Sequence, residues 1–213
     1  EYGEGASNDK YVEIYNPTDA AVSLSAYGYP TVSNAPTVVG QHEYWNSFDA
    51  GAHVPAYGVY VICHASASAQ ILAHCNTTYQ YLSNGDDGMC LVHGTESSYE
   101  KIDCIGDFQG DPGSGWAVCG TSAATKDHVL VRKSSVSQGN MGDWSSSAGT
   151  STADCEWEVL AKDAWSGLGS HSMTTSLPSP PPPSPLPPSL PPVPPVAGTG
   201  APSPPPPSLP PPP

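Results

Sequence analysis

The prolines of this chain constrain its structure more than any other feature. Of its 26 prolines, 5 lie before residue 178 and the other 21 lie in the last 36 residues, Pro178 to Pro213. Proline fixes φ at about −65° and donates no backbone hydrogen bond, so this segment can neither continue a helix nor pair in a sheet. Polyproline II is the regular form that remains. The sequence therefore predicts a polyproline II rod over 178–213, with a break near 196–201, where Val, Ala, Gly and Thr interrupt the prolines.

The residues before the rod have the composition of one globular domain. They carry every charged side chain, 20 acidic and 6 basic for a net charge of −14, and all 6 cysteines. We assign residues 1–170 to this domain and residues 171–177 to a linker. An acidic surface repels phosphate groups, which disfavours nucleic acid as a direct partner. No apolar stretch approaches the roughly 20 residues that span a bilayer, so no membrane insertion is expected.

The cysteines are spread over the domain without the CxxC spacing of redox and zinc motifs. An even number of such cysteines is typical of disulfides, which persist outside the cytosol. Many connectivities are open to them, and proximity along the chain favours nearest neighbours. The expected pairs are Cys63 with Cys75, Cys90 with Cys104, and Cys119 with Cys155. The second pair is the best supported, because Met89–His93 and Lys101–Ile105 predict the two strands of one hairpin, with the thiols across the ladder.

A glycosylation signal agrees with this compartment. Asn76-Thr77-Thr78 is an N-glycosylation sequon, with Asn76 as the acceptor, whereas Asn16-Pro17-Thr18 is blocked by its central proline. Cysteines and sequon together predict an extracellular, secreted protein.

The hydrophobic periodicity of the domain is that of strands. Lys10–Tyr15 alternates, and Gly58–His64 is a nearly continuous apolar run, which is typical of a strand buried on both faces. Val129–Val131 lies in a third alternating segment, and Val22–Leu24 and Glu156–Leu160 are candidate edge strands. No segment shows a sustained helical period, so we expect an all-β fold, a β-sandwich.

Residues 1–18, EYGEGASNDKYVEIYNPT, resemble the opening of lamin-tail-like domains of secreted bacterial and algal proteins, whose pattern is approximately EYxEGSSNNKxxEIYNPT. The similarity continues through GVYVICHASA, SNGDDGMCLVH, IDCIGDFQGDPGSGW and GTSAATKDHVLVRK, and it covers about residues 1–168. The resemblance implies an immunoglobulin-like β-sandwich that serves as a binding or assembly module, often attached to an extracellular enzyme. The chain departs from the family in its many cysteines and in Tyr27–Ala52, whose conformation the sequence does not assign.

The tail has a repeat with a resemblance of its own. The motif PSPPPPS occurs at 178–184 and again at 202–208, and such units resemble the extensin and pherophorin-like hydroxyproline-rich glycoproteins of plant and algal walls. That resemblance implies hydroxylated, glycosylated prolines and glycosylated serines. The residues concerned are Ser179, Pro180, Pro181, Pro182, Pro183, Ser184, Ser203, Pro204, Pro205, Pro206, Pro207 and Ser208.

Two kinds of site chemistry are less favoured by the sequence than a structural role. Cys63 beside His64 and His74 beside Cys75 could form thiol–base pairs or a zinc site, but cysteines in an oxidising compartment are usually bonded to each other. Oxygen ligands for calcium are present at Asp86, Asp87, Asp107 and Asp111. They lack EF-hand spacing, and aspartates also cap turns. We therefore expect that the protein is not an enzyme, that it has no catalytic residue and that it requires no cofactor.

Aromatic side chains offer a binding surface. Tyr and Trp faces are the surfaces on which polyproline stacks. The candidates for a groove that binds the tail are the tyrosines of Tyr27–Tyr44 or the tryptophans of the C-terminal half, Trp116, Trp144, Trp157 and Trp165.

These features lead to a structural role. We expect a subunit of an extracellular fibre or cell-wall layer that self-associates head to tail, with the rod of one copy held by the domain of the next and with glycans attached covalently. The alternatives are a monomeric module that binds glycans or a wall partner, and an accessory domain of a larger secreted enzyme.

Overall fold

The computed structural model describes residues 1–174. The predicted rod, its break near 196–201 and its modified prolines and serines lie outside the described residues. Contacts place Glu1–Thr175 in one unit. Within that unit His171 packs on Tyr15 and Thr174 donates to the Ser134 carbonyl oxygen, so residues that the sequence assigns to a linker lie against the body.

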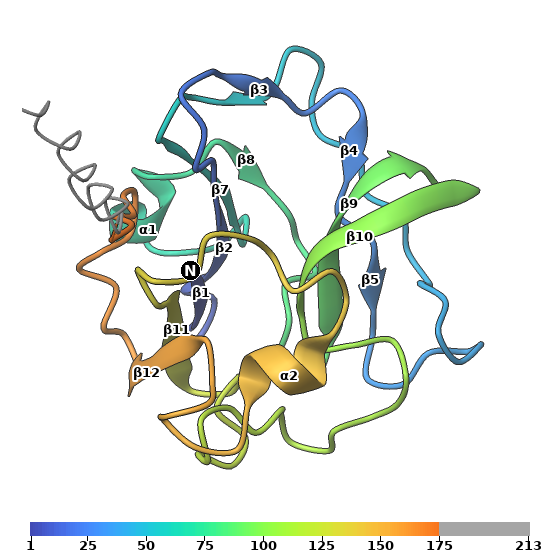
Figure 1. Cartoon of the computed structure of the whole chain (residues 1–213), viewed down its shortest axis with the longest axis vertical. Coiled ribbons are helices and arrows are strands. Elements are labelled where there is room, and N and C mark those ends of the chain that lie inside the picture. The colour runs from blue at the N-terminus through green and yellow to red at the C-terminus, as the bar shows by residue number, and fades with distance from the viewer. Residues whose placement is uncertain (175–213) are drawn as a thin grey trace, which may run out of the picture. The chain divides into compact units, whose positions relative to one another are not determined.

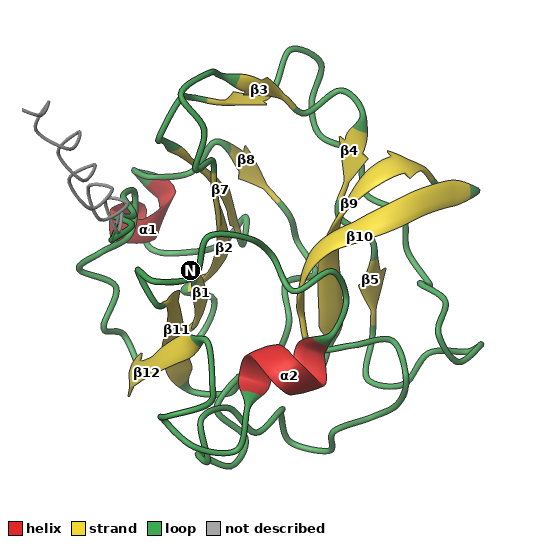
Figure 2. Cartoon of the chain, in the orientation of Figure 1, coloured by secondary structure: helices red, strands yellow, loops and turns green. Residues whose placement is uncertain are grey.

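The described residues form an all-β fold with two short helices, as Figure 2 shows. One sheet has six strands in the order β12-β11-β1-β2-β7-β8, a second contains β10, β9, β4 and β5, and β3 pairs with β6 alone. The strands are β1 (Tyr2–Glu4), β2 (Lys10–Tyr15), β3 (Val22–Ser23), β4 (Tyr27–Gly28), β5 (Thr31–Val32), β6 (His53–Val54), β7 (Val59–Cys63), β8 (Thr77–Thr78), β9 (Gly88–Thr95), β10 (Ser98–Ile105), β11 (His128–Arg132) and β12 (Trp157–Ala161). The helices are α1 (Ala69–Leu72) and α2 (Trp144–Ala148).

Strand β7 lies in the core and is covered on both faces, as its apolar run predicts. Val61 and Cys63 pack in one cluster with Ile71 of α1. Tyr60 and Ile62 point the other way and pack with residues of the second sheet, including Tyr27. Strands β2 and β7 pair antiparallel over Tyr11–Tyr15 and Val59–Cys63, and both are interior strands of the larger sheet (Figure 1).

The predicted hairpin is confirmed as β9 and β10. Its register places Cys104 directly opposite Cys90, with their Cα atoms 4.0 Å apart. The other disulfides join Cys63 to Cys75 and Cys119 to Cys155, so the three pairs are those expected from proximity along the chain. Three disulfides indicate an oxidising, extracellular environment.

The unassigned stretch Tyr27–Ala52 forms one edge of the second sheet. Strands β4 and β5 both pair with β9, and the loop that follows returns to place Tyr44 beside Thr31. Close packing requires glycine in β4, because a Cβ on Gly28 would lie 2.7 Å from the Trp45 ring. The two segments involved are too short to show a strand period, which is why the sequence pattern does not reveal them.

Both helices are single turns of four and five residues, too short to produce a helical pattern in the sequence. The Asp143 side chain caps α2 by accepting the Ser146 N–H. Within residues 1–174, no helix has the length and apolar character needed to cross a membrane.

Candidate binding groove

The tryptophans of the C-terminal half lie in the core or pack against it. Trp144 and Trp157 are 3% exposed, and their ring centroids are 6.0 Å apart. Trp116 packs edge-on against Trp144 at 6.5 Å, and the Arg132 guanidinium lies 4.0 Å over the Trp157 ring. The rings of Trp144 and Trp157 are covered by protein, whereas Trp116 and Trp165 are half-buried and pack against core clusters. Tail binding by these tryptophans is therefore not favoured, and it stays an untested prediction.

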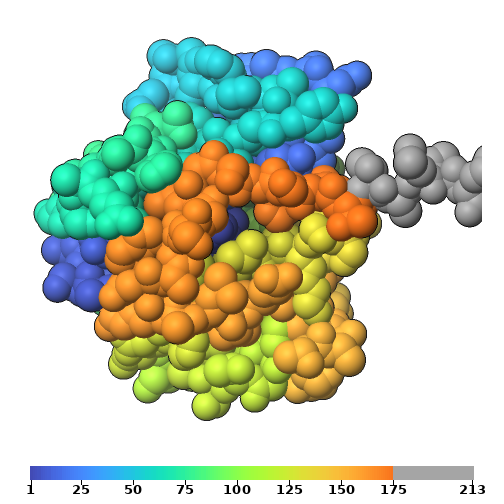
Figure 3. Space-filling view, turned by 90° about the vertical axis from the view of Figure 1, so that its left-hand side faces the viewer, coloured from blue at the N-terminus to red at the C-terminus, as the bar shows by residue number. Residues whose placement is uncertain are grey.

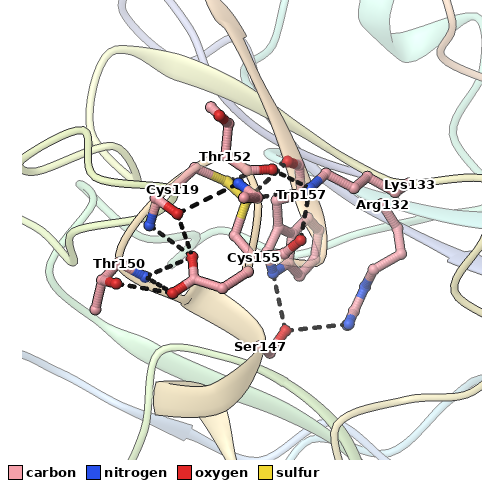
Figure 4. The surroundings of a disulfide bond; sticks show 11 residues. Cys119, Arg132, Lys133, Ser147, Thr150, Thr152, Cys155 and Trp157 are labelled. Carbon is pink, nitrogen blue, oxygen red and sulfur yellow. Dashed lines mark hydrogen bonds between the residues drawn. A yellow bond between two sulfur atoms is a disulfide. The ribbon is translucent and has the colours of Figure 1, made fainter.

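A disulfide fixes this tryptophan cluster from one side (Figure 4). The Trp157 indole N–H and Arg132 both donate to the Ser147 hydroxyl, at 2.9 and 3.1 Å. Lys133 donates to the carbonyl oxygens of Thr152 and Cys155, at 2.8 and 2.6 Å. These bonds give hydrogen-bond partners to the polar side chains around the Cys119–Cys155 bridge. Such a paired network stabilises the fold and leaves these groups unavailable to a ligand.

A groove lies instead between β5 and the segment that follows β8. It is a cleft of about 610 Å³, and two of its tyrosines, Tyr44 and Tyr81, are 55% and 77% exposed. Tyr44 comes from the loop after β5, where its carbonyl oxygen accepts the Thr31 N–H at 2.9 Å. Tyr81 comes from the segment that follows β8. We call this cleft the tyrosine groove; it is lined by Asn8, Lys10, Thr31, Val32, Ser33, Tyr44, His64, Tyr79, Gln80, Tyr81, Leu82, Ser83, Asn84, Asp87, Gly88 and Met89.

Tyr79 anchors the groove to the core. Its ring contacts Tyr29 edge-on at 5.8 Å and Tyr81 at 5.9 Å. Tyr29 is buried, so the aromatic contacts run from the interior to the exposed Tyr81. Of the tyrosines in Tyr27–Tyr44, Tyr44 lines the groove, whereas Tyr27 packs against His93.

The polar groups of the groove offer little net charge. The Lys10 ammonium is buried and bonds the Asn84 side-chain oxygen at 2.6 Å and the Glu4 carboxylate at 3.3 Å. Asp87 accepts the Asn34 N–H at 2.9 Å, and burial raises the pKa of the Asp87 carboxyl. Because Glu4 pairs with the one lysine and Asp87 adds a carboxyl group, the groove disfavours an anion and suits an uncharged ligand that has hydrogen-bond acceptors and apolar rings.

The cysteine–histidine pairs have no free thiol. Cys63 and Cys75 are bonded to each other, so neither sulfur can act as a nucleophile or a metal ligand. His64 is buried, and its Nδ1 accepts the Ser66 N–H at 3.0 Å. Its Nε2 lies 3.5 Å from the Gln80 side chain, so this histidine supports the back of the groove.

The aspartates proposed as calcium ligands serve turns. Asp107 accepts the Gln109 N–H and Asp111 accepts the Gly113 N–H, both at 2.7 Å. Asp86 has one buried carboxylate oxygen without a hydrogen bond in the part of the chain that the structure describes. Across residues 1–174, no three His, Cys, Asp or Glu side chains come together in a group that could hold a metal ion.

The sequon asparagine lies at the surface beside β8. Asn76 is exposed, and its Oδ1 accepts the Val61 N–H at 2.8 Å. This bond uses the oxygen and not Nδ2, the atom to which an N-linked glycan is attached, so glycosylation at Asn76 stays a prediction that is compatible with the local geometry.

Comparison of the chain with protein-family models, with curated proteins and with solved structures finds no match.

Proposed function

We propose that the protein is a structural subunit of an extracellular fibre or wall layer, whose tyrosine groove binds the proline-rich tail of another copy. The observation that carries this proposal is the groove itself, with two exposed tyrosines, in a chain with two copies of PSPPPPS. Such a protein acts by binding and not by catalysis.

The groove and the tail have matching chemistry. Polyproline II exposes its pyrrolidine rings, and its carbonyl oxygens have no internal partners. Tyr44 and Tyr81 offer ring faces for the prolines, and the Gln80 amide and the tyrosine hydroxyls can donate to the carbonyls. The tail carries no charged residue, which suits a groove whose lysine is already paired.

The proposed assembly follows from each copy carrying both partners, a groove and a tail. A groove on one copy and a tail on the next form a heterologous contact, and such contacts produce open filaments when they do not close into a ring. A preordered polyproline segment loses little conformational entropy on binding, so a small contact repeated along a filament can suffice. We also propose that the fold is an immunoglobulin-like sandwich related to lamin-tail domains, which the two packed sheets support. The proposal further includes hydroxylation and glycosylation of the tail prolines.

Sedimentation of the full chain tests this function. We expect wild-type protein to form concentration-dependent oligomers, and the double variant Tyr44→Ala, Tyr81→Ala to remain monomeric. Tyr57→Ala is the matched control, because Tyr57 is 62% exposed and does not line the groove. Equal association of all three proteins, or a monomeric wild type, would contradict the proposal.

Glycan recognition is the second candidate, since exposed aromatic rings beside the amides of Gln80 and Asn84 also suit a neutral sugar. In that case neutral wall oligosaccharides, and not a PSPPPPS peptide, would bind to a monomeric chain and lose affinity in Tyr81→Ala.

A further inference from the structure

An apolar cavity of about 350 Å³ lies between the two sheets. The inference drawn from it does not depend on the function proposed for the tyrosine groove. Val12, Ile14 and Ile62 of the six-stranded sheet form one wall. Leu91 of β9 and Ile102 of β10 form part of the other wall. The space is lined mainly by apolar atoms and opens to solvent on one side, so it is a pocket and not a closed interior void. It lies in the range of small-molecule binding pockets.

All three methionines of the chain line this cavity. They are Met89, Met141 and Met173, and they come from β9, from the loop before α2 and from the C-terminal end of the described residues. Methionine is unbranched and polarisable, and it adapts to ligands of irregular shape. Their convergence gives the cavity an adaptable lining, which is typical of a binding surface.

One side of the cavity opens to solvent beneath the segment Gly169–Thr174. Figure 3 shows a hollow bordered by this orange segment and by the yellow loop after β11, with blue N-terminal residues inside. The segment is held at three points. The Gly169 N–H donates to Glu13 at 2.6 Å, and His171 packs on Tyr15 at 4.8 Å. Thr174 donates its N–H to the Ser134 carbonyl oxygen and shares a hydrogen bond with the Ser134 hydroxyl, both at 2.8 Å. A ligand can enter here by displacing a short segment without opening either sheet.

The charges at the opening disfavour an anion. Glu1, Glu13 and Asp103 line the cavity, and Arg132 is the one Lys or Arg residue among the described residues that line it. Its guanidinium is already bound by Asp103, at 2.5 Å, and by Glu156. A carboxylate or phosphate ligand would therefore meet acidic side chains and no unpaired lysine or arginine among the described lining residues.

We propose that the inter-sheet cavity is a binding site for a neutral, mainly aliphatic molecule, such as a long-chain alcohol. The apolar walls bury the chain of the ligand, the three methionines adapt to it, and the hydroxyl faces the polar opening. The site is distinct from the tyrosine groove, although Met89 lines both.

Methionine methyl NMR on the full chain tests this site directly, because the chain has only these three methionines. With the methyl groups labelled with ¹³C, titration with 1-decanol is expected to shift all three signals with one saturable dissociation constant. Decanoate is expected to bind at least tenfold more weakly. No shift, or a shift limited to Met89 as a groove ligand would cause, overturns the site; equal affinity for decanoate overturns the assignment of a neutral ligand.

A filling substitution supplies a second test. Leu91→Trp places a larger side chain in the cavity and is expected to lower 1-decanol affinity at least tenfold. Leu72→Trp is the matched control, because Leu72 lies on α1, is 37% exposed and does not line the cavity. Unchanged affinity in a folded Leu91→Trp protein, judged by near-UV circular dichroism, would contradict the proposal. The titration of the unmodified chain decides the question if this variant does not fold.

Discussion

The tryptophan cluster and the tyrosine groove are both aromatic, and they differ in what covers the rings. Trp157 is 3% exposed, stacked under Arg132 and bonded to Ser147. Tyr81 is 77% exposed, and among residues 1–174 its ring contacts one other ring, that of Tyr79. Aromatic rings with covered faces stabilise a core, whereas exposed rings beside a cleft are available to a ligand. Aromatic content alone therefore does not locate a binding site.

The largest difference between the two regions should appear in the free energy of unfolding of their variants. Trp157→Ala removes a buried ring and the cation–π contact with Arg132, and should lower the free energy of unfolding by about 3–5 kcal/mol. Tyr81→Ala should change it by less than about 0.5 kcal/mol, because an exposed side chain leaves no cavity. Denaturant titration of both variants measures the difference. Similar losses would remove the distinction between the two regions.

Loss of the disulfide beside the tryptophan cluster should have the next largest effect. Replacing Cys119 and Cys155 by serine should cost about 2–5 kcal/mol of unfolding free energy. The control is the same change at Cys63 and Cys75, which are 12 residues apart where the first pair is 36 apart. A shorter loop restricts the unfolded chain less, so the control should lose less stability by about 1 kcal/mol. The reverse order would show that native contacts, and not chain entropy, dominate.

Tyr81→Ala should weaken self-association of the full chain by more than about 1 kcal/mol, a factor of five or more. The expected cause is the loss of a stacking face for the tail prolines. Analytical ultracentrifugation over a concentration series gives the constant. A Trp116→Phe control, which keeps an aromatic ring in the core cluster, should associate like wild type.

The smallest expected effect is a pH dependence next to the Cys119–Cys155 bridge. Asp154 accepts hydrogen bonds from Thr150 and Ser151, which hold the pKa of its carboxyl well below the usual range. A depressed pKa in the folded state contributes stability above the unfolded-state pKa of about 3.9, and this contribution is lost as pH falls through the folded-state value. Asp154→Asn should thus be slightly less stable than wild type at pH 7, with a difference that shrinks below about pH 4. Thermal melts across this range, with exposed Asp19→Asn as the control, would refute the idea if the difference did not change with pH.

Local patterns in the sequence predict much of the fold and little of the groove. Alternation and apolar runs identify β2 and β7, and the cysteine spacing of the β9–β10 hairpin identifies a cross-strand bridge. These signals are local, because each depends on residues that are near one another in the chain. The groove joins Tyr44 to Tyr81 across 37 positions through two-residue strands, which carry no periodic signal. The alternation Tyr79-Gln80-Tyr81 beside a turn is the one sequence signal for an exposed aromatic surface here. This pattern does not show that Tyr44 lies across the groove from Tyr81.

Site-specific photo-cross-linking tests the central claim most directly. A benzophenone amino acid at position 81 of the full chain should cross-link to tail peptides of another copy, in the region 178–213, as identified by mass spectrometry. The same group at position 57 should not. Absence of tail cross-links from position 81, or equal yields from both positions, would contradict the account of a groove that holds the proline-rich segment.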